Sequence, residues 1–488
     1  MATNYTVVLF SRQHIGNDPG VFNDVEPNVV FVGRAKEFPF DCPGVNSAEA
    51  AFLMFQSRDV DHQRNVFRVN GEDVFGGLPA SPARDAWNGN ILLVERHHQL
   101  KATGNVLRVE ARTSDGGSAG DVDDFIIDNV VIMYKTLDVG PTVTGDLAAF
   151  LTSGLLASIA NVRGSGSGAE AADQRNEYVL PTPAQLVAWR TVFRSLIAGA
   201  WDQAHTQARM ISSTYNVVRF FDTSSGRTHY ILMEGVPGQI PEPKAHSSGV
   251  PITNPADLTR RGWGTYMFGA QPQRALSFSA PHLKDDLETE HQAIEAYLAS
   301  RARTLLIAGT DRDQNTADAP CARSQRPYKE SDVSHTAECV FQIAFEEIYS
   351  SDASTWHVQF HGNASCSEDV FLSNGVPNPP AMLQTLATNI ETASAAAATA
   401  AGGGRVIAAG VFDASGGCPA RGTDNMQMRF ASGLPHASIC RDESVPIGPS
   451  RFIHVEQRRT VRRAPSDSEA TPGVNRAIVL SGILATFL

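Results

Sequence analysis

The sequence predicts two domains of different fold class: an N-terminal all-β sandwich and a C-terminal α/β domain with a mixed sheet flanked by helices. Three observations predict this division. The 488 residues exceed the usual size of one domain. Short apolar segments separated by turn residues fill the first part, and strand and helix patterns alternate in the rest. We expect the sandwich at 1–140, a helical linker at 141–175 and the α/β domain at 176–488.

Six short apolar segments predict the strands of the sandwich, because Gly, Pro, Asn and Asp separate them at turn spacing. In VLRVEAR, at 106–112, charged and apolar side chains alternate, as in a strand with one face in water. The segments are YTVVLF, NVVFVGR, NVFRVNG, GNILLVERH, NVLRVEART and DDFIIDNVVIMYKT. The domain resembles the jelly-roll and galactose-binding-like sandwiches that accompany secreted hydrolases, which makes a bound glycan an expectation.

Apolar strands and helical patterns alternate in the second part, which is typical of a mixed or parallel sheet. The expected strands are YNVVRFFDT, THYILMEG, TYMFG, ALSFSAP, RTLLIAGT, WHVQFHG, RVIAAGVFD and FIHVEQ. The expected helices are LETEHQAIEAYLASRA, HTAECVFQIAFEEIYSS and AMLQTLATNIETASAAAATAA, with a further helix in the linker, DLAAFLTSGLLASIANV. Apolar spacing also predicts one amphipathic helix over 181–210.

The charge balance limits the class of partner. A net charge of −12 argues against nucleic acid, since phosphate binding needs a basic surface. The N-terminus shows no basic stretch followed by an apolar core, so no secretory signal is expected. The longest apolar run, AIVLSGILATFL at the C-terminus, is too short to predict a membrane span.

Five of the six cysteines follow residue 320, and none belongs to a C-x-x-C pair. A structural zinc finger is therefore not expected. The clustered thiols indicate one or two disulfides and an extracellular location, with buried free cysteine as the alternative.

Chemistry-bearing residues follow the first of four apolar strands at the point where it ends. ALSFSAP leads into His282, with Asp285, Asp286, Glu288 and Glu290 close behind. A histidine followed within a few residues by acids suits a zinc site, which takes imidazole nitrogen and carboxylate oxygen. Acids at the start of the next helix are the competing explanation.

The second strand, WHVQFHG, places His357, Gln359 and His361 on one face by its period of two. His361 lies at the strand end beside Gly362, so we expect His361 to be the third ligand. His357 lies deeper and is expected to be a core residue.

The third and fourth strands supply a carboxylate and a guanidinium. FIHVEQ places Phe452, His454 and Glu456 on one face, and the Glu456 carboxylate, near the end of this strand, either pairs with an arginine or faces a catalytic water as general base. LLIAGTDRDQN carries Arg312 and Asn315, and a guanidinium there suits an oxyanion or a substrate carboxylate. Ordinary turn chemistry explains the Asp and Asn residues equally well.

Taken together, these strand ends resemble those of zinc carboxypeptidase-type hydrolases, with a phosphorylase/hydrolase-like fold, and more closely poly-gamma-glutamate hydrolases. SAPHLKDDLE resembles their Pro-His, turn and hydrophobic-Glu motif, which implies His282 and Glu288 as ligands. FHG resembles the strand of their third ligand, His361, and HVEQRRTVR the strand of their catalytic glutamate, Glu456. GTDNMQMRF lies where they carry an Asn and Arg stretch, which implies Asn425 and Arg429 in substrate binding.

The resemblance covers about 275–465 and departs from the family in two ways. LKDD replaces the usual glycines with an added residue, which leaves Asp286 or Glu290 as alternative ligands to Glu288. Arg458 replaces a serine, so we expect a substrate preference different from that of the family.

The resemblance implies a hydrolase that cleaves an amide or peptide bond, with a bond next to a carboxylate as one expected target, and that holds one zinc ion with an open position for water. Glu456 would take the proton of that water, and Arg312 or Arg429 would stabilise the oxyanion or hold a substrate carboxylate. The expected substrate is a small acidic peptide or polymer. The alternative is a non-catalytic carbohydrate-binding or structural protein with a degenerate hydrolase domain. A serine or cysteine hydrolase is disfavoured, since no G-x-S-x-G elbow is present.

Overall fold

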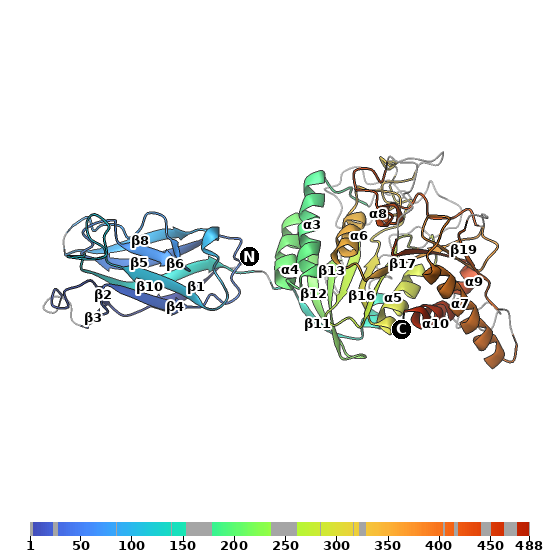
Figure 1. Ribbon diagram of the computed structural model, residues 1–488, viewed down its shortest axis with the longest axis horizontal. Helices are drawn as coiled ribbons and strands as arrows, with labels where there is room; N and C mark the ends of the chain where they lie inside the picture. The colour runs from blue at the N-terminus through green and yellow to red at the C-terminus, as the bar shows by residue number, and fades with distance from the viewer. Residues whose placement is uncertain are drawn as a thin grey trace, which may run out of the picture. The chain divides into compact units, whose positions relative to one another are not determined.

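The computed structural model divides into two compact units, Met1–Val139 and Gly140–Leu488 (Figure 1). All-β sheets form the first unit, and a mixed sheet with helices forms the second. The described residues are 3–22, 28–83, 85–137, 139–152, 178–235, 261–283, 285–315, 317–321, 328–403, 406–413, 418–440, 450–462 and 476–487.

The first unit contains a six-stranded and a four-stranded sheet among its described residues. The larger sheet has the order β3-β2-β10-β5-β8, with β1 also paired to β10. Its strands are β1 (Thr3–Leu9), β2 (Gln13–Ile15), β3 (Val30–Phe31), β5 (Ala51–Arg58), β8 (Trp87–Val94) and β10 (Phe125–Lys135). The smaller sheet, in the order β4-β9-β6-β7, consists of β4 (Ala35–Phe40), β9 (Asn105–Glu110), β6 (Val66–Val69) and β7 (Glu72–Asp73). A short 3-10 helix, η1, spans Arg96–His98.

Alternating side chains join the two sheets into a sandwich. In β5, Leu53 and Phe55 are buried, Met54 between them is half-buried, and Phe52 and Gln56 on either side are exposed. Phe55 stacks on Phe67 of β6, in the other sheet, with ring centroids 4.8 Å apart. Each of the six predicted segments contains a strand, whereas β2, β4, β5 and β7 lie outside these segments and were not predicted, although side chains alternate clearly in β5.

A single mixed sheet, with ten strands among the described residues, forms the centre of the second unit in the order β11-β12-β13-β14-β16-β15-β17-β20-β18-β19. Strands β16, β15, β17 and β20 are mutually parallel. The strands are β11 (Thr142–Gly145), β12 (Tyr215–Asp222), β13 (Arg227–Glu234), β14 (Thr265–Gly269), β15 (Arg274–Ala280), β16 (Ala302–Ile307), β17 (Trp356–Gly362), β18 (Val370–Ser373), β19 (Ala409–Val411) and β20 (Phe452–Gln457).

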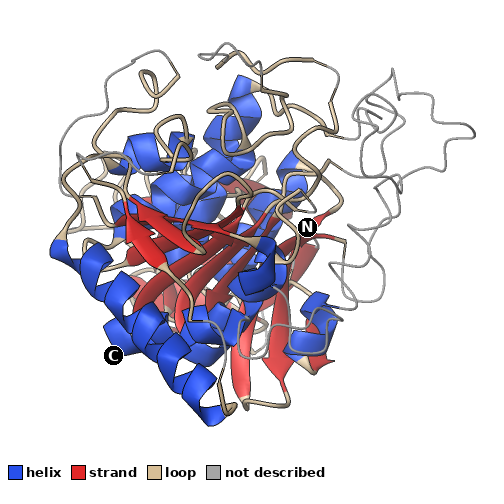
Figure 2. Cartoon of the chain, turned by 90° about the vertical axis from the view of Figure 1, so that its right-hand side faces the viewer, coloured by secondary structure: helices blue, strands red, loops and turns tan. Residues whose placement is uncertain are grey.

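Helices cover both faces of this sheet (Figure 2). They are α1 (Leu147–Ala149), α3 (Pro183–Ile197), α4 (Trp201–Ile211), α5 (Thr289–Ser300), α6 (Val340–Ser351), α7 (Ala381–Ala400), α8 (Met426–Ala431), α9 (Arg459–Arg462) and α10 (Arg476–Thr486). Helices α3, α4, α6 and α8 form one packed group, and α5, α7 and α10 form another. In the described part of the chain, no helix has the length and hydropathy needed to cross a bilayer.

Two expectations for the helices differ from the structure. Residues 142–145, expected in the helical linker, form β11, which pairs in parallel with β12 at the sheet edge. Most of the rest of that linker lies outside the described residues. The single helix expected over 181–210 is two helices, α3 and α4, because Gly199 between them adopts a left-handed φ of 75°.

The parallel strands position the functional residues. Because β16, β15, β17 and β20 run in the same direction, their carboxyl-terminal ends meet at one edge of the sheet. Strands β16 and β17 flank β15 on opposite sides, so the chain crosses β15 between them. Open α/β sheets bind ligands in the crevice at such a switch point.

Candidate metal centre

A cavity of about 240 Å³ opens at this edge of the sheet. Its wall includes residues that follow β15 and β16, the last two residues of β17, a stretch at 419–425, and two side chains of β20. The residues that line it are His282, Asp286, Arg312, Tyr328, His335, His361, Gly362, Pro419, Ala420, Arg421, Gly422, Thr423, Asp424, Asn425, His454 and Glu456. Each of the four predicted strand ends supplies one residue that was expected in the site: His282, Arg312, His361 and Glu456.

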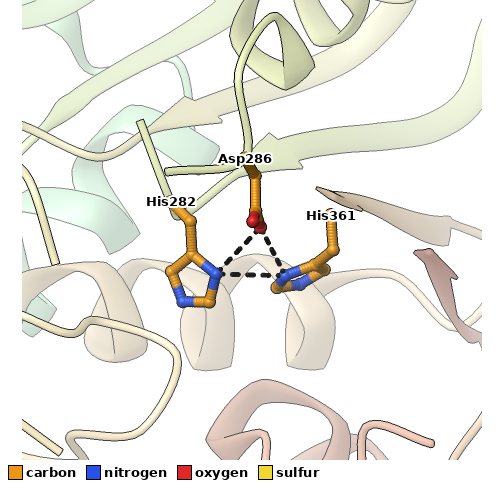
Figure 3. A group of neighbouring side chains, drawn as sticks. All are labelled: His282, Asp286 and His361. Atoms are coloured by element: carbon orange, nitrogen blue, oxygen red, sulfur yellow. Dashed lines mark hydrogen bonds and ion pairs between the residues drawn. The ribbon is translucent and has the colours of Figure 1, made fainter. Parts of the chain in front are cut away.

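His282, Asp286 and His361 converge in this cavity (Figure 3). The two Nδ1 atoms of the histidines lie 3.2 Å apart. The Asp286 carboxylate lies 3.0 Å from Nδ1 of His282 and 3.3 Å from Nδ1 of His361. All three side chains are buried, so the structure brings together three donor atoms of the kinds that bind transition metals.

The opposite ring nitrogen of each histidine faces a hydrogen-bond acceptor. Nε2 of His282 lies 3.0 Å from the buried carboxylate of Asp332, and Nε2 of His361 lies 2.9 Å from Oε1 of Gln359. Such outer partners hold the proton on Nε2 and leave the Nδ1 lone pair directed at the shared point. Carboxylate or carbonyl partners of this kind accompany nearly all metal-binding histidines.

The charges of the cluster favour a cation at its centre. Burial and the Arg312 cation disfavour protonation of His282, but Asp332 and Asp286 outweigh them and raise its pKa to about 9. Burial lowers the pKa of His361 to about 4. Burial opposes ionisation of Asp286, yet hydrogen bonds to His282 and His361 hold its pKa below the usual value. At neutral pH the proton on His282 therefore balances the charge of Asp286, and a bound metal ion would displace that proton.

The carboxylate beside the two histidines is Asp286, and Glu288 lies elsewhere. Glu288 adopts a left-handed φ of 72° just before α5, and its side chain accepts a hydrogen bond of 2.8 Å from Arg476. The added residue in LKDD thus brings Asp286, one turn after His282, into the position expected for Glu288. Neither Glu288 nor the other alternative, Glu290, is among the residues that line the cavity.

Glu456 reaches the cavity from β20 and is buried, with 7% of its surface exposed. Its Oε2 atom has no hydrogen-bond partner among the described residues. Burial, followed by the charge of Asp286, raises the pKa of Glu456 to about 8. A carboxylate that is buried, directed into a cavity and without a partner on one oxygen is suited to receive a proton.

His454 lines the cavity, although no role is predicted for it from the sequence beyond its shared strand face with Glu456. Its ring packs on that of His361, with centroids 4.2 Å apart, and its Nε2 lies 3.6 Å from Glu456. Burial, followed by the nearby histidines His361 and His282, lowers its pKa well below the usual value. His454 is therefore neutral and forms part of the cavity wall.

Arg312 lies in the cavity wall as expected, fixed by a carboxylate that the sequence did not reveal. Its Nη2 atom lies 2.8 Å from Asp332, which also bonds His282 and accepts from His335. Asp332 and His335 lie in the loop between β16 and α6, more than twenty residues along the chain from the end of β16. The only signal for them is the pair of polar residues in SDVSH, which is common in loops.

Three residues expected to contact substrate have structural partners. Arg429 is fully buried, and its guanidinium donates to the carbonyl groups of Ile439 and Thr423. Asn315 is buried against Tyr178, away from the cavity wall. Asn425 does line the cavity, but its Oδ1 accepts from the N–H of Met428 and so caps α8.

The wall at 419–425 is anchored by a disulfide. Cys418 precedes this stretch and is bonded to Cys366, which follows β17. A second disulfide joins Cys321 to Cys440, whereas Cys339 is buried as a free thiol. The expectation of one or two disulfides among the clustered cysteines thus agrees with the structure.

Arg421 is the cation of this wall. Its Nε donates to the carbonyl of Cys418, and its guanidinium lies 5.1 Å from the ring centroid of Phe412. No carboxylate of the described residues forms an ion pair with it. Arg421 also lines the cavity.

No family model matches the chain, and no curated protein matches it. Among solved structures, an N-formylglutamate amidohydrolase from Ralstonia eutropha JMP134 is 13% identical, with a TM-score of 0.27, and the match covers 46% of this chain and 96% of that one. A metallo-carboxypeptidase from Burkholderia cenocepacia is 9% identical, with a TM-score of 0.25 and 99% of both chains covered. A beta-porphyranase of glycoside hydrolase family 86 from Bacteroides plebeius is 15% identical, with a TM-score of 0.19, over 28% of this chain and 21% of that one.

This chain thus spans about a fifth of the porphyranase. At these TM-scores the likenesses do not establish a shared fold. The chemistry of the site has to follow from its own residues.

Proposed function

We propose that the chain is a zinc-dependent hydrolase that cleaves an amide or peptide bond. His282, Asp286 and His361 would hold the metal, and Glu456 would act as general base. One observation carries the proposal: two histidine Nδ1 atoms and a carboxylate converge within 3.3 Å of one another, in a cavity that Glu456 also lines. This combination of three ligands and a separate carboxylate is typical of hydrolytic zinc sites.

The donor set fits zinc in chemistry and in spacing. Zinc binds histidine nitrogen and carboxylate oxygen at about 2.0–2.2 Å, so tetrahedral ligands lie about 3.3 Å apart. The three pairs of donor atoms lie 3.0, 3.2 and 3.3 Å apart. The buried carboxylate of Asp332 behind His282 supplies the outer partner that such sites require.

When bound, zinc would polarise the substrate carbonyl and make water acidic enough to attack at neutral pH. Glu456 accepts the proton of the attacking water and returns it to the leaving nitrogen. Its pKa of about 8, raised by burial, matches that double role at neutral pH. Burial of the histidines and of Glu456 limits competition from bulk water.

Arg312 is suited to stabilise the oxyanion that forms on the carbonyl. Asp332 holds its guanidinium in place, so little reorganisation accompanies the reaction. Arg421, on the other wall, is suited to bind a carboxylate of the substrate, because no acidic side chain of the described residues neutralises it. A small acidic peptide or polymer is therefore the proposed substrate class.

A screen of amide substrates tests the proposal. The zinc-loaded chain should hydrolyse peptides or N-acyl amino acids with an acidic group faster than their neutral counterparts. Arg421→Met should raise KM for the acidic substrates and leave the neutral ones unchanged. Zinc binding without hydrolysis of any member would count against an enzyme and favour a binding protein.

A further inference from the structure

The hydrogen on the His361 ring has to be on Nε2 if Nδ1 is to bind a metal ion. Nε2 lies 2.9 Å from Oε1 of Gln359, which is an acceptor and favours this tautomer. A glutamine side chain can also present its NH₂ group, which would favour the opposite tautomer. The orientation of the Gln359 amide therefore decides whether His361 can be a ligand.

Asn425 fixes that orientation from one side. Its Nδ2 atom donates to Oε1 of Gln359 at 2.5 Å. Its own oxygen accepts from the N–H of Met428 at 2.9 Å, as the N-cap of α8. Because a backbone N–H can only donate, Asn425 cannot turn over without losing the cap, so it presents a donor to Gln359.

A row of buried amides fixes Gln359 from the other side. Gln359 donates to Oε1 of Gln427 at 3.2 Å, and Gln427 donates to the carbonyl of Val333 at 2.9 Å and to Gln342 at 2.8 Å. Gln342 in turn donates to Glu346 at 2.9 Å. The carbonyl group of Val333 and the carboxylate of Glu346 can only accept hydrogen bonds, so each amide of the row has one favoured orientation.

We propose that Asn425 is a positioning residue that acts through Gln359 to keep hydrogen on Nε2 of His361 and so leave Nδ1 to the metal. The inference rests on the proposed metal site and adds a residue that controls its affinity. Asn425, Gln359 and Gln427 are all at most 2% exposed, so water cannot replace a lost donor at low cost.

Asn425→Asp is the sharpest test, since aspartate is nearly isosteric with asparagine and caps a helix equally well. It replaces the donor that faces Gln359 with an acceptor, which favours the reversed Gln359 amide and a hydrogen on Nδ1 of His361. We expect zinc affinity to fall about 10- to 100-fold, measured by competition with a chelating dye on the full chain. A purely electrostatic effect has the opposite sign, because an added negative charge near a cation tightens binding.

Two matched variants separate these effects. Thr423→Asp adds a negative charge to the same cavity wall and keeps the Asn425 donor to Gln359, so zinc should bind as tightly as in the wild type, or more tightly. Asn425→Ser keeps a capping oxygen and adds no charge, and Gln427 still orients Gln359, so its loss should be smaller than that of Asn425→Asp.

Histidine ¹⁵N NMR of the zinc-free chain, with the His361 signals assigned by a His361→Ala variant, reads the tautomer directly. We expect hydrogen on Nε2 in the wild type and a shift toward Nδ1 in Asn425→Asp. Zinc affinity and a tautomer unchanged in both Asn425 variants would overturn the inference and leave the proposed function standing. If Asn425→Asp does not fold, an unchanged Asn425→Ser overturns it, and a weakened one supports it. A wild-type chain that binds no zinc would instead refute the proposed function.

Discussion

His361 and Glu456 occupy paired positions on the neighbouring parallel strands β17 and β20, and both side chains line one cavity. The pairing follows from register alone: His357, Gln359 and His361 face Phe452, His454 and Glu456 in turn. The proposed metal ligand and the proposed general base are therefore held side by side by backbone hydrogen bonds. This rigidity is what a hydrolytic site needs, since small misplacements of catalytic groups lower the rate sharply.

Glu456→Gln should remove turnover and retain zinc. The amide keeps the shape of the side chain but cannot accept the proton, so kcat should fall about 100- to 10,000-fold. Zinc content by elemental analysis and kcat on the best amide substrate would be measured together. Full activity in the variant would eliminate Glu456 as the base.

Replacing each candidate carboxylate separately by its amide tests whether Asp286 or Glu288 is the metal ligand. Asp286→Asn should weaken zinc binding severely, because a ligand oxygen is replaced by a neutral amide. Glu288→Gln, the matched control, loses only part of its interaction with Arg476 and should bind zinc as the wild type does. The reverse pattern would restore Glu288 as the ligand.

The residues at strand ends could be read from the sequence, because the carboxyl ends of parallel strands meet at one edge. His282, His361, Glu456 and Arg312 illustrate this, since each lies at or just after a recognisable apolar strand. That inference required one assumption, namely that the four strands are neighbours in one sheet, and the sheet order β16-β15-β17-β20 agrees with it.

The remaining parts of the site depend on contacts between distant segments. Asp286 rather than Glu288 faces the histidines because the backbone at Glu288 is left-handed and Arg476, from the far end of the chain, engages its side chain. Asp332 lies in an irregular loop. Arg429 is buried, and its guanidinium donates hydrogen bonds to two carbonyl groups instead of facing the cavity. No local pattern encodes these contacts. A glycan at the sandwich stays a prediction.

Removal of the Cys366–Cys418 disulfide should loosen the wall that carries Arg421. The double variant Cys366→Ser/Cys418→Ser should raise KM for acidic substrates while zinc stoichiometry is unchanged, because none of the three proposed ligands belongs to the wall at 419–425. The loss of a native crosslink of this size also typically costs about 2–5 kcal/mol of stability. Steady-state kinetics and chemical denaturation would measure the two effects. An unchanged KM would show that the wall holds its position without the crosslink.

The ion pairs of His436 predict a stability that depends on pH. Hydrogen bonds to Glu338 and Glu346 raise the pKa of His436 to about 9. A raised folded-state pKa contributes stability that is complete below the unfolded pKa of about 6.5 and is lost as the pH rises through 9. After allowance for solvent screening, about 1–2 kcal/mol should be lost between pH 6 and pH 10.

His436→Gln provides the matched control, because glutamine does not titrate in this range. The free energy of unfolding, from urea denaturation at a series of pH values, should fall more steeply for the wild type than for the variant. Parallel curves would show that His436 does not contribute through its charge.

The most direct test of the metal centre is elemental analysis of the full chain, purified without a metal-chelating tag, for the wild type and for His361→Ala. The arrangement of His282, Asp286 and His361 predicts about one zinc per wild-type chain and its loss in the variant. A wild-type chain that binds no zinc, even after incubation with zinc salts, would contradict the assignment.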